Sequence, residues 1–278
     1  MRPKPQDIDL VIYHGNCMDG FASAWAAWKL LGDKAEYMAA AYSDSVPDVA
    51  GRKVAIIDFS YSRRELKQMI EKSNALIVLD HHKSAEDDLK GIEEAVFDMS
   101  RSGAMMSWQF FHPGVDPPTF LRYIEDRDLW RFELENSRAV SAAMMTLVDK
   151  TFEAFDAMGN PAQFEELIND GYTILYHNKS MTERICAQAR KGTWKGYEIY
   201  MVNSAVLQSE IGSHLSSSCD FVIIWYYDHM RNEYKVSLRS GPELDVSKIA
   251  RMWGGGGHAA AAGFVLGPSI SPIQVFHG

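Results

Sequence analysis

The sequence predicts an α/β protein with a parallel sheet in its N-terminal part, a helical linker, and a second, smaller α/β domain at its C-terminal end. Three observations lead to this prediction. In the first half, short and continuously apolar runs alternate with amphipathic stretches, as in a sheet covered by helices on both faces. From residue 102 to about residue 190 the pattern is helical. Beyond residue 193, runs rich in β-branched and aromatic residues return.

Three apolar runs of the first half are predicted strands. They are Ile8–Tyr13, Val54–Ile57 and Ala75–Leu79. Helices are expected after the first two strands, at Gly20–Leu31 and Ser62–Lys72, because apolar residues recur there at helical spacing. The first half therefore consists of βα units.

The middle of the chain is predicted to be helical and the C-terminal part to be mixed. The expected helices of the middle are Gly103–Phe111, Pro118–Glu125, a stretch around Arg138–Val148, and Pro161–Lys191. The expected C-terminal elements are the strands Tyr197–Val202, Phe221–Tyr227 and Tyr234–Leu238, then a helix at Asp245–Met252 and the glycine run Gly254–Gly257. We therefore predict a domain over residues 1–135, a helical connector over 136–192, and a C-terminal domain over 193–278.

Composition narrows the class of protein. With 278 residues, 46% of them hydrophobic and 12% aromatic, the chain can bury a core, which excludes disorder as its main state. A net charge of −9 repels polyanions, so we do not expect a protein that binds duplex DNA. The three cysteines lack C-x-x-C spacing, which argues against a disulfide framework. No signal-like or membrane-spanning run is found, so we expect a cytoplasmic protein with no membrane partner.

Ionisable side chains follow each of the three predicted strands. They are His14 and Asp19 after the first strand, Asp58 after the second, and Asp80, His81 and His82 after the third. Because the carboxyl ends of parallel strands share one edge of a sheet, we expect these side chains to lie close together. Carboxylates and imidazoles suit borderline divalent ions, and several buried carboxylates are unfavourable unless cations neutralise them. The sequence therefore predicts a metal site at this edge.

A further candidate position lies at the end of the predicted helix Pro118–Glu125. Asp126 and Asp128 flank Arg127 there, and Trp130 follows. The aromatic neighbour favours a partly buried site. A solvated acidic turn with an ion pair to Arg127 is the alternative.

Together these motifs resemble the DHH phosphoesterase superfamily, which includes RecJ-type exonucleases, nanoRNases, phosphoadenosine phosphatases and, more distantly, manganese pyrophosphatases. The matching positions are Asp80, His81 and His82 for the name-giving motif, His14 with Asp19 and Gly20 for the first motif, Asp58 for the second, and Asp126 with Asp128 for the fourth. The run Gly254–Gly257 with His258, followed by residues 262–264, resembles the signature of the associated C-terminal domain. The motifs stand in the family's order and span most of the chain.

The resemblance implies one or two Mn²⁺ ions, with Mg²⁺, Fe²⁺ or Co²⁺ as alternatives. It assigns Asp58 as the bridging ligand and His14 to the first ion. It assigns Asp19, His81 and Asp128 to the second ion, with Asp126 as an additional candidate ligand. Asp80 and His82 are the candidate catalytic residues. If His81 binds metal, we expect His82 not to do so but to donate to a phosphate, with a structural hydrogen-bonding role as the alternative.

The first motif departs from the family's pattern. In the family's first motif a histidine is followed, after three other residues, by an aspartate and, one residue later, by a second aspartate. In this chain the motif is one residue shorter, and Asn16 and Cys17 stand in place of the first aspartate. We expect Cys17 to pack as a small apolar residue behind the turn. A thiolate ligand, which would favour zinc or iron, is the alternative. We therefore expect one firmly held ion and a second that is held loosely or arrives with substrate.

Several positions are predicted to hold the substrate. In the C-terminal domain they are Arg239, which resembles the family's substrate-binding arginine, the backbone amides of Gly255, Gly256 and Gly257, and the side chain of His258. A surface arginine at a strand end is the alternative for Arg239. Trp253 is expected to pack beneath the glycine loop rather than to stack on a base.

Arg101 is a candidate for binding a terminal phosphate at the start of the following helix, whose N-terminal amides attract anions. We expect Ser102 to cap that helix rather than to bind substrate.

The resemblance and the charge together predict a metal-dependent phosphodiesterase of the nanoRNA-type exonuclease class. Its expected partner is a short single-stranded oligonucleotide or a small nucleotide. The alternatives are a 3′,5′-bisphosphate nucleotidase, a cyclic-dinucleotide phosphodiesterase, a nucleotide-binding regulator with weak turnover, and a pyrophosphatase or exopolyphosphatase, against which the glycine-rich C-terminal domain argues. The exposed faces of residues 161–191 are a candidate homodimer interface.

Overall fold

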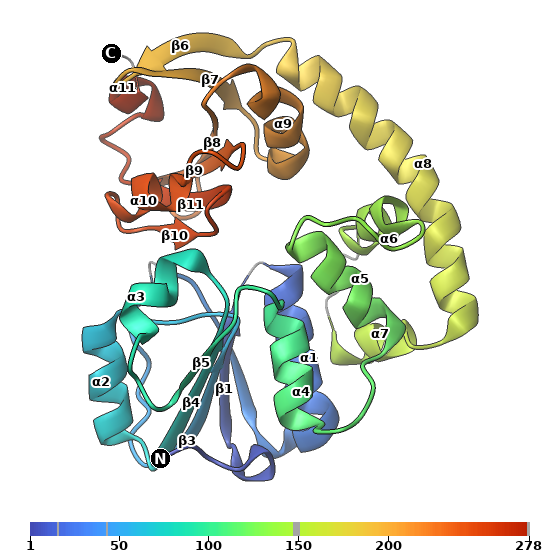
Figure 1. The fold of residues 1–278 in the computed structure, drawn as a ribbon, viewed down its shortest axis with the longest axis vertical. Helices are drawn as coiled ribbons and strands as arrows, with labels where there is room; N and C mark the ends of the chain where they lie inside the picture. Colours follow the sequence, from blue (N-terminus) through green and yellow to red (C-terminus); the bar gives the residue numbers. More distant parts are fainter. Residues whose placement is uncertain (16, 43, 147–150, 277–278) are drawn as a thin grey trace. The chain divides into compact units, whose positions relative to one another are not determined.

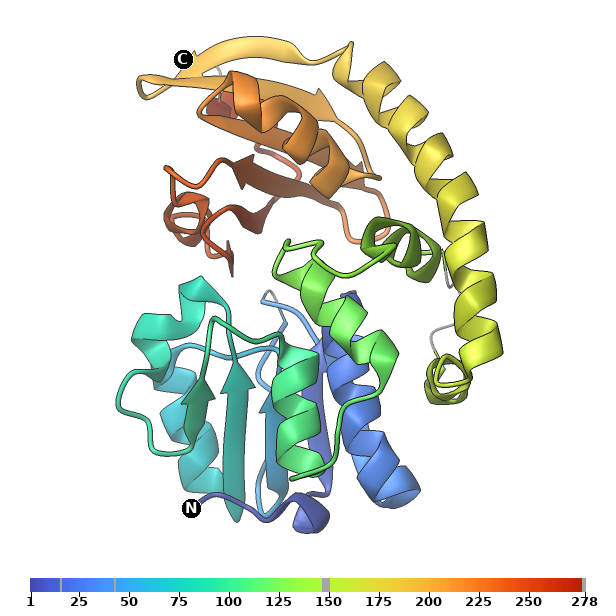
Figure 2. The same cartoon turned by 45° about the vertical axis from the view of Figure 1, so that its right-hand side comes forward.

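The computed structural model describes residues 1–15, 17–42, 44–146 and 151–276 (Figures 1 and 2). The chain divides into two compact units, Met1–Leu175 and Tyr176–Gly278. Each unit contains its own sheet. This confirms the predicted fold class, and the three-part domain division stays a prediction.

A parallel five-stranded sheet with the order β2-β1-β3-β4-β5 forms the centre of the first unit. Its strands are β1 (Leu10–His14), β2 (Glu36–Ala40), β3 (Lys53–Ile57), β4 (Ala75–Asp80) and β5 (Ala95–Phe97). Strands β1, β3 and β4 confirm the three predicted strands. The sequence did not reveal β2 and β5, because β2 is a half-exposed edge strand and β5 has only three residues.

Helices cover both faces of this sheet, as Figure 1 shows. Helices α1 (Met18–Leu31) and α4 (Gly103–Phe111) pack on one face, where Val11 and Ile57 are buried. Helix α2 (Arg63–Lys72) packs on the other face against Ile12 and Ile56. Alternate residues of each central strand thus enter two different cores, which explains why these strands are apolar at every position.

The first unit contains further helices and 3₁₀ turns. They are α3 (Glu86–Leu89), α5 (Thr119–Asp128), α6 (Ser137–Met144), α7 (Phe152–Ala157), and the 3₁₀ turns η1 (Pro5–Asp7), η2 (Gly32–Lys34) and η3 (Lys83–Ala85). Helices α5, α6 and α7 share a core with α1 and α4, in which Trp25 stacks on Trp108 with ring centroids 5.7 Å apart. Val148, in the predicted third helix of the middle, lies outside the described residues.

Helix α8 (Pro161–Cys186) runs from the first unit into the second. The predicted helix Pro161–Lys191 was wrong over its last residues, because β6 (Arg190–Trp194) begins there. Lys191 pairs with Tyr200 in an antiparallel ladder with the next strand. This pairing is a tertiary contact, which the local periodicity does not report.

The second unit contains a six-stranded mixed sheet with the order β10-β11-β9-β8-β7-β6. Its other strands are β7 (Tyr197–Asn203), β8 (Phe221–Asp228), β9 (Glu233–Ser240), β10 (Gly256–Gly257) and β11 (Ala261–Leu266). The helices are α9 (Gln208–Leu215), the 3₁₀ turn η4 (Ser216–Ser218), α10 (Val246–Arg251) and α11 (Pro272–Phe276). Residues of α10 and α11 contribute to the core on one face of the sheet and residues of α9 to the core on the other. Among the described residues, no helix has the length and apolar character needed to span a bilayer.

Candidate metal centre

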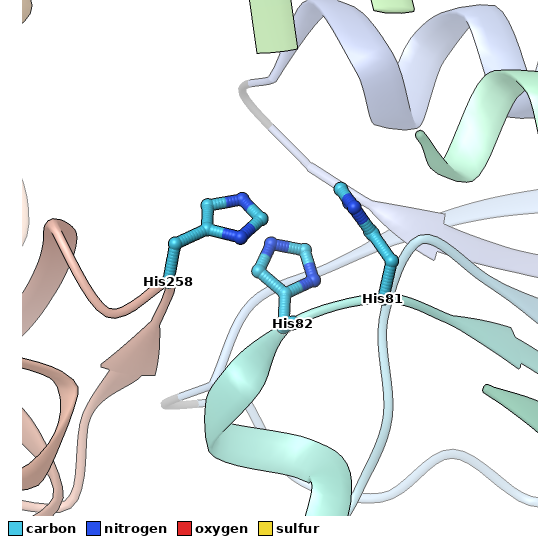
Figure 3. A group of neighbouring side chains, drawn as sticks. All are labelled: His81, His82 and His258. Carbon is cyan, nitrogen blue, oxygen red and sulfur yellow. The ribbon is translucent and has the colours of Figure 1, made fainter. Parts of the chain in front are cut away.

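The side chains predicted from the three strand ends do come together in the first unit. Asp58 follows β3, and Asp80, His81 and His82 close β4 and begin the loop after it. Figure 3 shows His81 and His82 next to each other at the end of β4. Their ring centroids are 4.7 Å apart and their ring planes are inclined by 62°. The carboxyl edge of the parallel sheet therefore assembles the site, as the sequence predicts.

Asp58 lies at the centre of this group. Its side chain is fully buried, and its backbone has a left-handed φ of 54° while its N–H donates to Leu79 O at 2.8 Å. Its carboxylate oxygens face different partners. Oδ1 lies 3.0 Å from His81 Nε2, whereas Oδ2 lies 3.6 Å from His14 Nδ1 and 3.8 Å from Cys17 Sγ. One carboxylate thus takes part in two separate groups of donor atoms.

The first donor group consists of Asp19, Asp58 and His81, all buried, with donor atoms within 4.8 Å of one another. His81 Nε2 lies 3.6 Å from Asp19 Oδ2 and also 3.6 Å from Asp128 Oδ2. Asp128 is the last residue of α5. The structure therefore brings together the four residues that the resemblance assigns to the second ion.

Asp19 is held in place by the start of α4. Its Oδ2 accepts from Gly103 N at 2.6 Å, and its Oδ1 accepts from Ala104 N at 3.1 Å. Ser102 caps the same helix by accepting from Met105 N at 3.2 Å, as predicted. The sequence predicts that the first amides of α4 attract a terminal phosphate near Arg101. In the structure these amides donate to Asp19 instead.

The second donor group consists of His14, Cys17 and Asp58, again with donor atoms within 4.8 Å of one another. His14 ends β1 and Cys17 is the residue before α1. The neighbouring candidate Asn16 lies outside the described residues. The thiol that was expected to pack behind the turn is therefore part of a donor set.

The electrostatics of the first group call for a cation. Burial and the neighbouring carboxylates of Asp58 and Asp128 raise the pKa of Asp19 well above its ordinary value, and burial also raises the pKa of Asp128. For Asp58 burial acts in the same direction, but the interactions with His14 and His81 outweigh it and hold its pKa well below the ordinary value. Burial lowers the pKa of His81, yet the surrounding carboxylates prevail and raise it to about 10. Three carboxylates cannot all ionise here without compensating positive charge.

A buried polar atom of the second donor group supports the same conclusion. His14 Nδ1 is buried and has no hydrogen-bond partner among the described residues. A buried polar atom without a partner is costly, and a divalent cation is one group that satisfies a nitrogen and several carboxylates together. The donor sets of this edge therefore fit metal ions.

Asp80 organises the backbone and the second histidine. Its Oδ1 accepts from His81 N at 2.7 Å and from His82 N at 3.0 Å, and it lies 2.8 Å from His82 Nδ1. This contact fixes the orientation of the His82 ring. Burial lowers the pKa of His82, but Asp80 outweighs it and raises that pKa overall.

Asp126 lies in a different environment from Asp128. Its carboxylate accepts from Glu133 N at 2.9 Å, from Leu134 N at 3.3 Å, and from the hydroxyl of Ser137. Within the described part of the chain, it belongs to neither donor group of the first unit. Asp126 thus holds the loop after α5.

In the second unit, Arg239 lies on β9 beneath α9. Its Nη1 donates to Leu238 O at 2.9 Å and its Nη2 to Ser209 Oγ at 3.2 Å. A Cβ at Gly212 would lie 2.2 Å from Arg239 Cγ. Position 212 therefore needs glycine, because any larger residue would collide with the side chain of Arg239. Arg239 is therefore a half-buried, oriented guanidinium rather than a loose surface charge.

The glycine run packs closely against β11. A Cβ at Gly255 would lie 2.0 Å from Gly263 O, and one at Gly257, where φ is 135°, would lie 2.6 Å from Ala261 O. Gly256 pairs with Gly263, and half-buried His258 follows in the turn. Gly255 N and His258 N donate to Ala250 O and Ala261 O. Close strand pairing thus accounts for glycine at these positions.

Trp253 stacks on Phe264 with centroids 5.8 Å apart, so it packs beneath the loop as predicted. Sequence reasoning missed Gly103, Ser209 and Gly212. For Gly103 a signal existed, since glycine directly after a capping serine is unusual inside a helix. For Ser209 and Gly212 there was none, because α9 itself was not predicted.

The comparisons with known proteins agree with this architecture. The DHHA1 domain model matches residues 200–269, which is most of the second unit. This match confirms the C-terminal domain that the sequence resemblance predicts. The second unit thus contains a DHHA1 domain, and the chain shares its fold with a solved DHH-domain structure described below.

Individual relatives are distant. Uncharacterized protein R106 of Acanthamoeba polyphaga mimivirus is 29% identical over 286 residues, covering 93% of this chain and 68% of that protein. The DHH domain of a member of the s1p family of ribosomal proteins has a TM-score of 0.55 at 13% identity, covering 94% of this chain and 83% of the other. The pGpG-specific phosphodiesterase PggH of Vibrio cholerae has a TM-score of 0.50 at 12% identity, covering 94% of both chains. At these identities the two solved structures show a common fold.

Proposed function

We propose that this protein is a manganese-dependent phosphodiesterase that hydrolyses short single-stranded oligonucleotides from one end. The observation that carries the proposal is the position of Asp58. Its Oδ1 faces the donor group of Asp19 and His81, while its Oδ2 faces His14. A carboxylate shared by two donor groups is the arrangement that a pair of divalent ions requires.

In this proposal the ligands divide into two sets. Asp19, Asp58, His81 and Asp128 hold one ion, and His14 with the other oxygen of Asp58 holds the second. Divalent ions supply the acidification of water and the positive charge on phosphoryl oxygens that hydrolysis at neutral pH needs. The hydrogen bonds from α4 keep the Asp19 carboxylate oriented for this role.

His82 is proposed to donate a hydrogen bond to the phosphoryl group. The contact of Asp80 with His82 Nδ1 holds the ring and favours its protonated form, in which both ring nitrogens carry a hydrogen atom that can be donated. Asp80 acts through His82 and is therefore a positioning residue.

The DHHA1 domain is proposed to hold the rest of the substrate. Arg239 is oriented by its bonds to Leu238 and Ser209, and a guanidinium in a fixed position suits a phosphate. His258 offers a second donor, and the run Gly255–Gly257 shapes the loop before it. In the first unit, Arg101 is proposed to bind a terminal phosphate.

Short substrates are favoured over long ones for two reasons. The net charge of −9 penalises long polyanions. A protein of the same fold is named for action on pGpG, a dinucleotide, so the fold is compatible with a short substrate. We therefore propose short oligonucleotides of a few residues as the substrate class, ahead of 3′,5′-bisphosphate nucleotides and pyrophosphate.

The test is a substrate panel with Mn²⁺. Dinucleotides, five-nucleotide RNA, longer RNA, a 3′,5′-bisphosphate nucleotide and pyrophosphate are compared by product release. We expect the highest kcat/KM on the short RNAs. Faster release of phosphate from the bisphosphate nucleotide or from pyrophosphate would contradict the proposed substrate class.

Asp58→Asn is the control for the metal centre, because asparagine tolerates the left-handed backbone at this position. This variant is expected to fold, to bind less metal and to lose activity on every substrate. Full turnover in Asp58→Asn with its metal retained would contradict the bridging role.

A further inference from the structure

The donor group of His14, Cys17 and Asp58 differs chemically from its neighbour. It contains a nitrogen, a sulfur and an oxygen, whereas the group of Asp19, Asp58 and His81 contains oxygens and one nitrogen. Thiolates are soft ligands that select zinc, ferrous iron or cobalt over manganese. The two groups, which share Asp58, therefore differ in the ions they suit.

The distances in this group match those between ligands of one ion. His14 Nδ1 lies 3.6 Å from Asp58 Oδ2, and Cys17 Sγ lies 3.8 Å from the same oxygen. With metal–nitrogen and metal–sulfur bonds of about 2.1 and 2.3 Å, two ligands at a tetrahedral ion lie roughly 3.5 Å apart. Only small adjustments are needed for the three atoms to share an ion.

Two further observations favour a ligand role for Cys17 over a role in packing alone. His14 Nδ1 is buried and has no hydrogen-bond partner among the described residues, although it points toward Asp58. Cys17 is the N-cap residue of α1, but its side chain makes no capping hydrogen bond. Serine or aspartate would cap this helix better. The sulfur reaches toward Asp58 Oδ2 instead.

We infer that Cys17 binds metal as a thiolate, together with His14 and Asp58, and that this position takes a borderline ion such as Zn²⁺ in preference to Mn²⁺. The other position, with Asp19, His81 and Asp128, keeps its preference for Mn²⁺. The enzyme thus carries two ions of different kinds that share Asp58. The inference rests on the proposed metal centre but not on the proposed substrate.

The test uses cobalt as a spectroscopic probe of the full-length protein. Metal-free protein is titrated with Co²⁺, and the near-ultraviolet thiolate-to-cobalt charge-transfer band is followed together with the number of ions bound. We expect the band in the unmodified protein and in Cys219→Ser, whose half-buried thiol donates to the backbone carbonyls of Leu215 and Phe221 in the second unit. We expect no band in Cys17→Ser or Cys17→Asp.

The two Cys17 variants also separate ligand loss from misfolding. Serine and aspartate are both favoured N-cap residues, so both variants are expected to fold. Cys17→Ser should weaken Zn²⁺ binding at this position by more than about 100-fold, because loss even of an outer-shell partner costs about 10–100-fold. Cys17→Asp should keep two ions but exchange the Zn²⁺ preference for Mn²⁺.

The outcomes that would overturn the inference are distinct from those that affect the wider proposal. Two cobalt ions bound without a thiolate band, or a band that persists in Cys17→Ser, would overturn the role of Cys17 alone. If no cobalt binds at all, both the inference and the proposed metal centre are wrong. Binding with the band present but without oligonucleotide hydrolysis would leave this inference standing and remove the proposed substrate.

Discussion

The backbone N–H of Gly103 donates a hydrogen bond of 2.6 Å to Oδ2 of Asp19, across 84 positions of the chain. This bond joins the first turn of α4 to the first turn of α1. Gly103 also lies against Asp58, because a Cβ at this position would be 2.4 Å from Asp58 Cβ and 2.5 Å from its Oδ1. The start of α4 therefore sets the separation of two proposed metal ligands.

Gly103→Ala is expected to disrupt the metal centre. The new methyl group has no room beside Asp58, so α4 or the carboxylate must move, at a cost of about 1–3 kcal/mol. We expect metal affinity to fall at least about tenfold, since that corresponds to 1.4 kcal/mol. Isothermal titration with Mn²⁺ measures this change.

Gly241→Ala is the matched control. Nothing lies within 4 Å of a Cβ at Gly241, and its backbone is not left-handed. Its metal affinity should equal that of the unmodified protein. Equal affinities in Gly103→Ala and Gly241→Ala would show that α4 does not position the ligands.

Asp128→Asn and Asp126→Asn are expected to have opposite effects, although the two residues stand two positions apart. Asp128 Oδ2 lies 3.6 Å from His81 Nε2, so its replacement should weaken metal binding and activity. Asp126 binds two amides and a hydroxyl of the following loop, so its replacement should lower the free energy of unfolding by about 1–3 kcal/mol with metal binding retained. Thermal melts and metal titrations of both variants check this. Weakened metal binding in Asp126→Asn at unchanged stability would reverse the assignment.

The contrast between Asp126 and Asp128 marks a limit of what the sequence can predict. The carboxyl ends of parallel strands lie at one edge of a sheet, so the sequence alone predicts that His81, Asp58 and His14 lie close together. Asp126 and Asp128 stand on one helix end, and the direction of each depends on the loop that Asp126 binds. Local spacing contains no information about that loop.

The same limit applies to the fold. The buried strands β1, β3 and β4 and the amphipathic helices α1 and α2 were predictable because burial imposes a periodic pattern. The edge strand β2 depends on its pairing with β1, which is distant in sequence, and β6 is a largely exposed edge strand of a hairpin with β7; both leave a weaker pattern. Cys17 is a further case, because its spacing to Asp58 exists only in the folded chain.

Metal binding at His81 is expected to release a proton at neutral pH. Burial opposes ionisation, but Asp58 and Asp128 prevail and raise the pKa of His81 to about 10, so the metal-free imidazole is protonated. An ion that binds Nε2 must displace this proton, and its affinity should rise with pH. Calorimetric titration in two buffers of different ionisation enthalpy counts the protons released. A count of zero at pH 7 would be incompatible with ligation by His81.

The raised pKa of His81 also predicts how the metal-free protein responds to pH. The charged imidazole stabilises the fold fully below the unfolded pKa of about 6.5. This contribution is lost as the pH rises through the folded pKa of about 10. The melting temperature of the metal-free protein should therefore fall over this range, and the fall should be smaller in His81→Asn. A constant melting temperature over the range would contradict the shift.

Asp80→Asn is expected to lower kcat while metal stays bound. Asp80 contacts His82 Nδ1 at 2.8 Å and is not part of either donor group described above. An amide in its place no longer favours the protonated imidazole, so the proposed donor is lost, at a cost of about 100-fold in kcat. The measurement is the pH dependence of kcat, whose basic limb should move to lower pH. An unchanged pH profile would mean that Asp80 only supports the backbone.

Removal of metal is expected to destabilise the first unit. Without an ion, Asp19, Asp58 and Asp128 share the positive charge of His81, and the pKa values of Asp19 and Asp128 rise as a result of burial and mutual repulsion. A ligand present at 100 times its Kd stabilises the folded state by about 2.7 kcal/mol, which corresponds to roughly 5–10 °C in Tm for a unit of this size.

Chelation should lower the Tm of the first unit by this amount, and Asp58→Asn should lose most of the response. Because the chain has two compact units, the transition must be assigned by a probe in the first unit, such as the amide hydrogen exchange of α1 and α4, whose Trp25 and Trp108 stack on each other. Coincident melts with and without chelator would mean that no ion binds among these carboxylates.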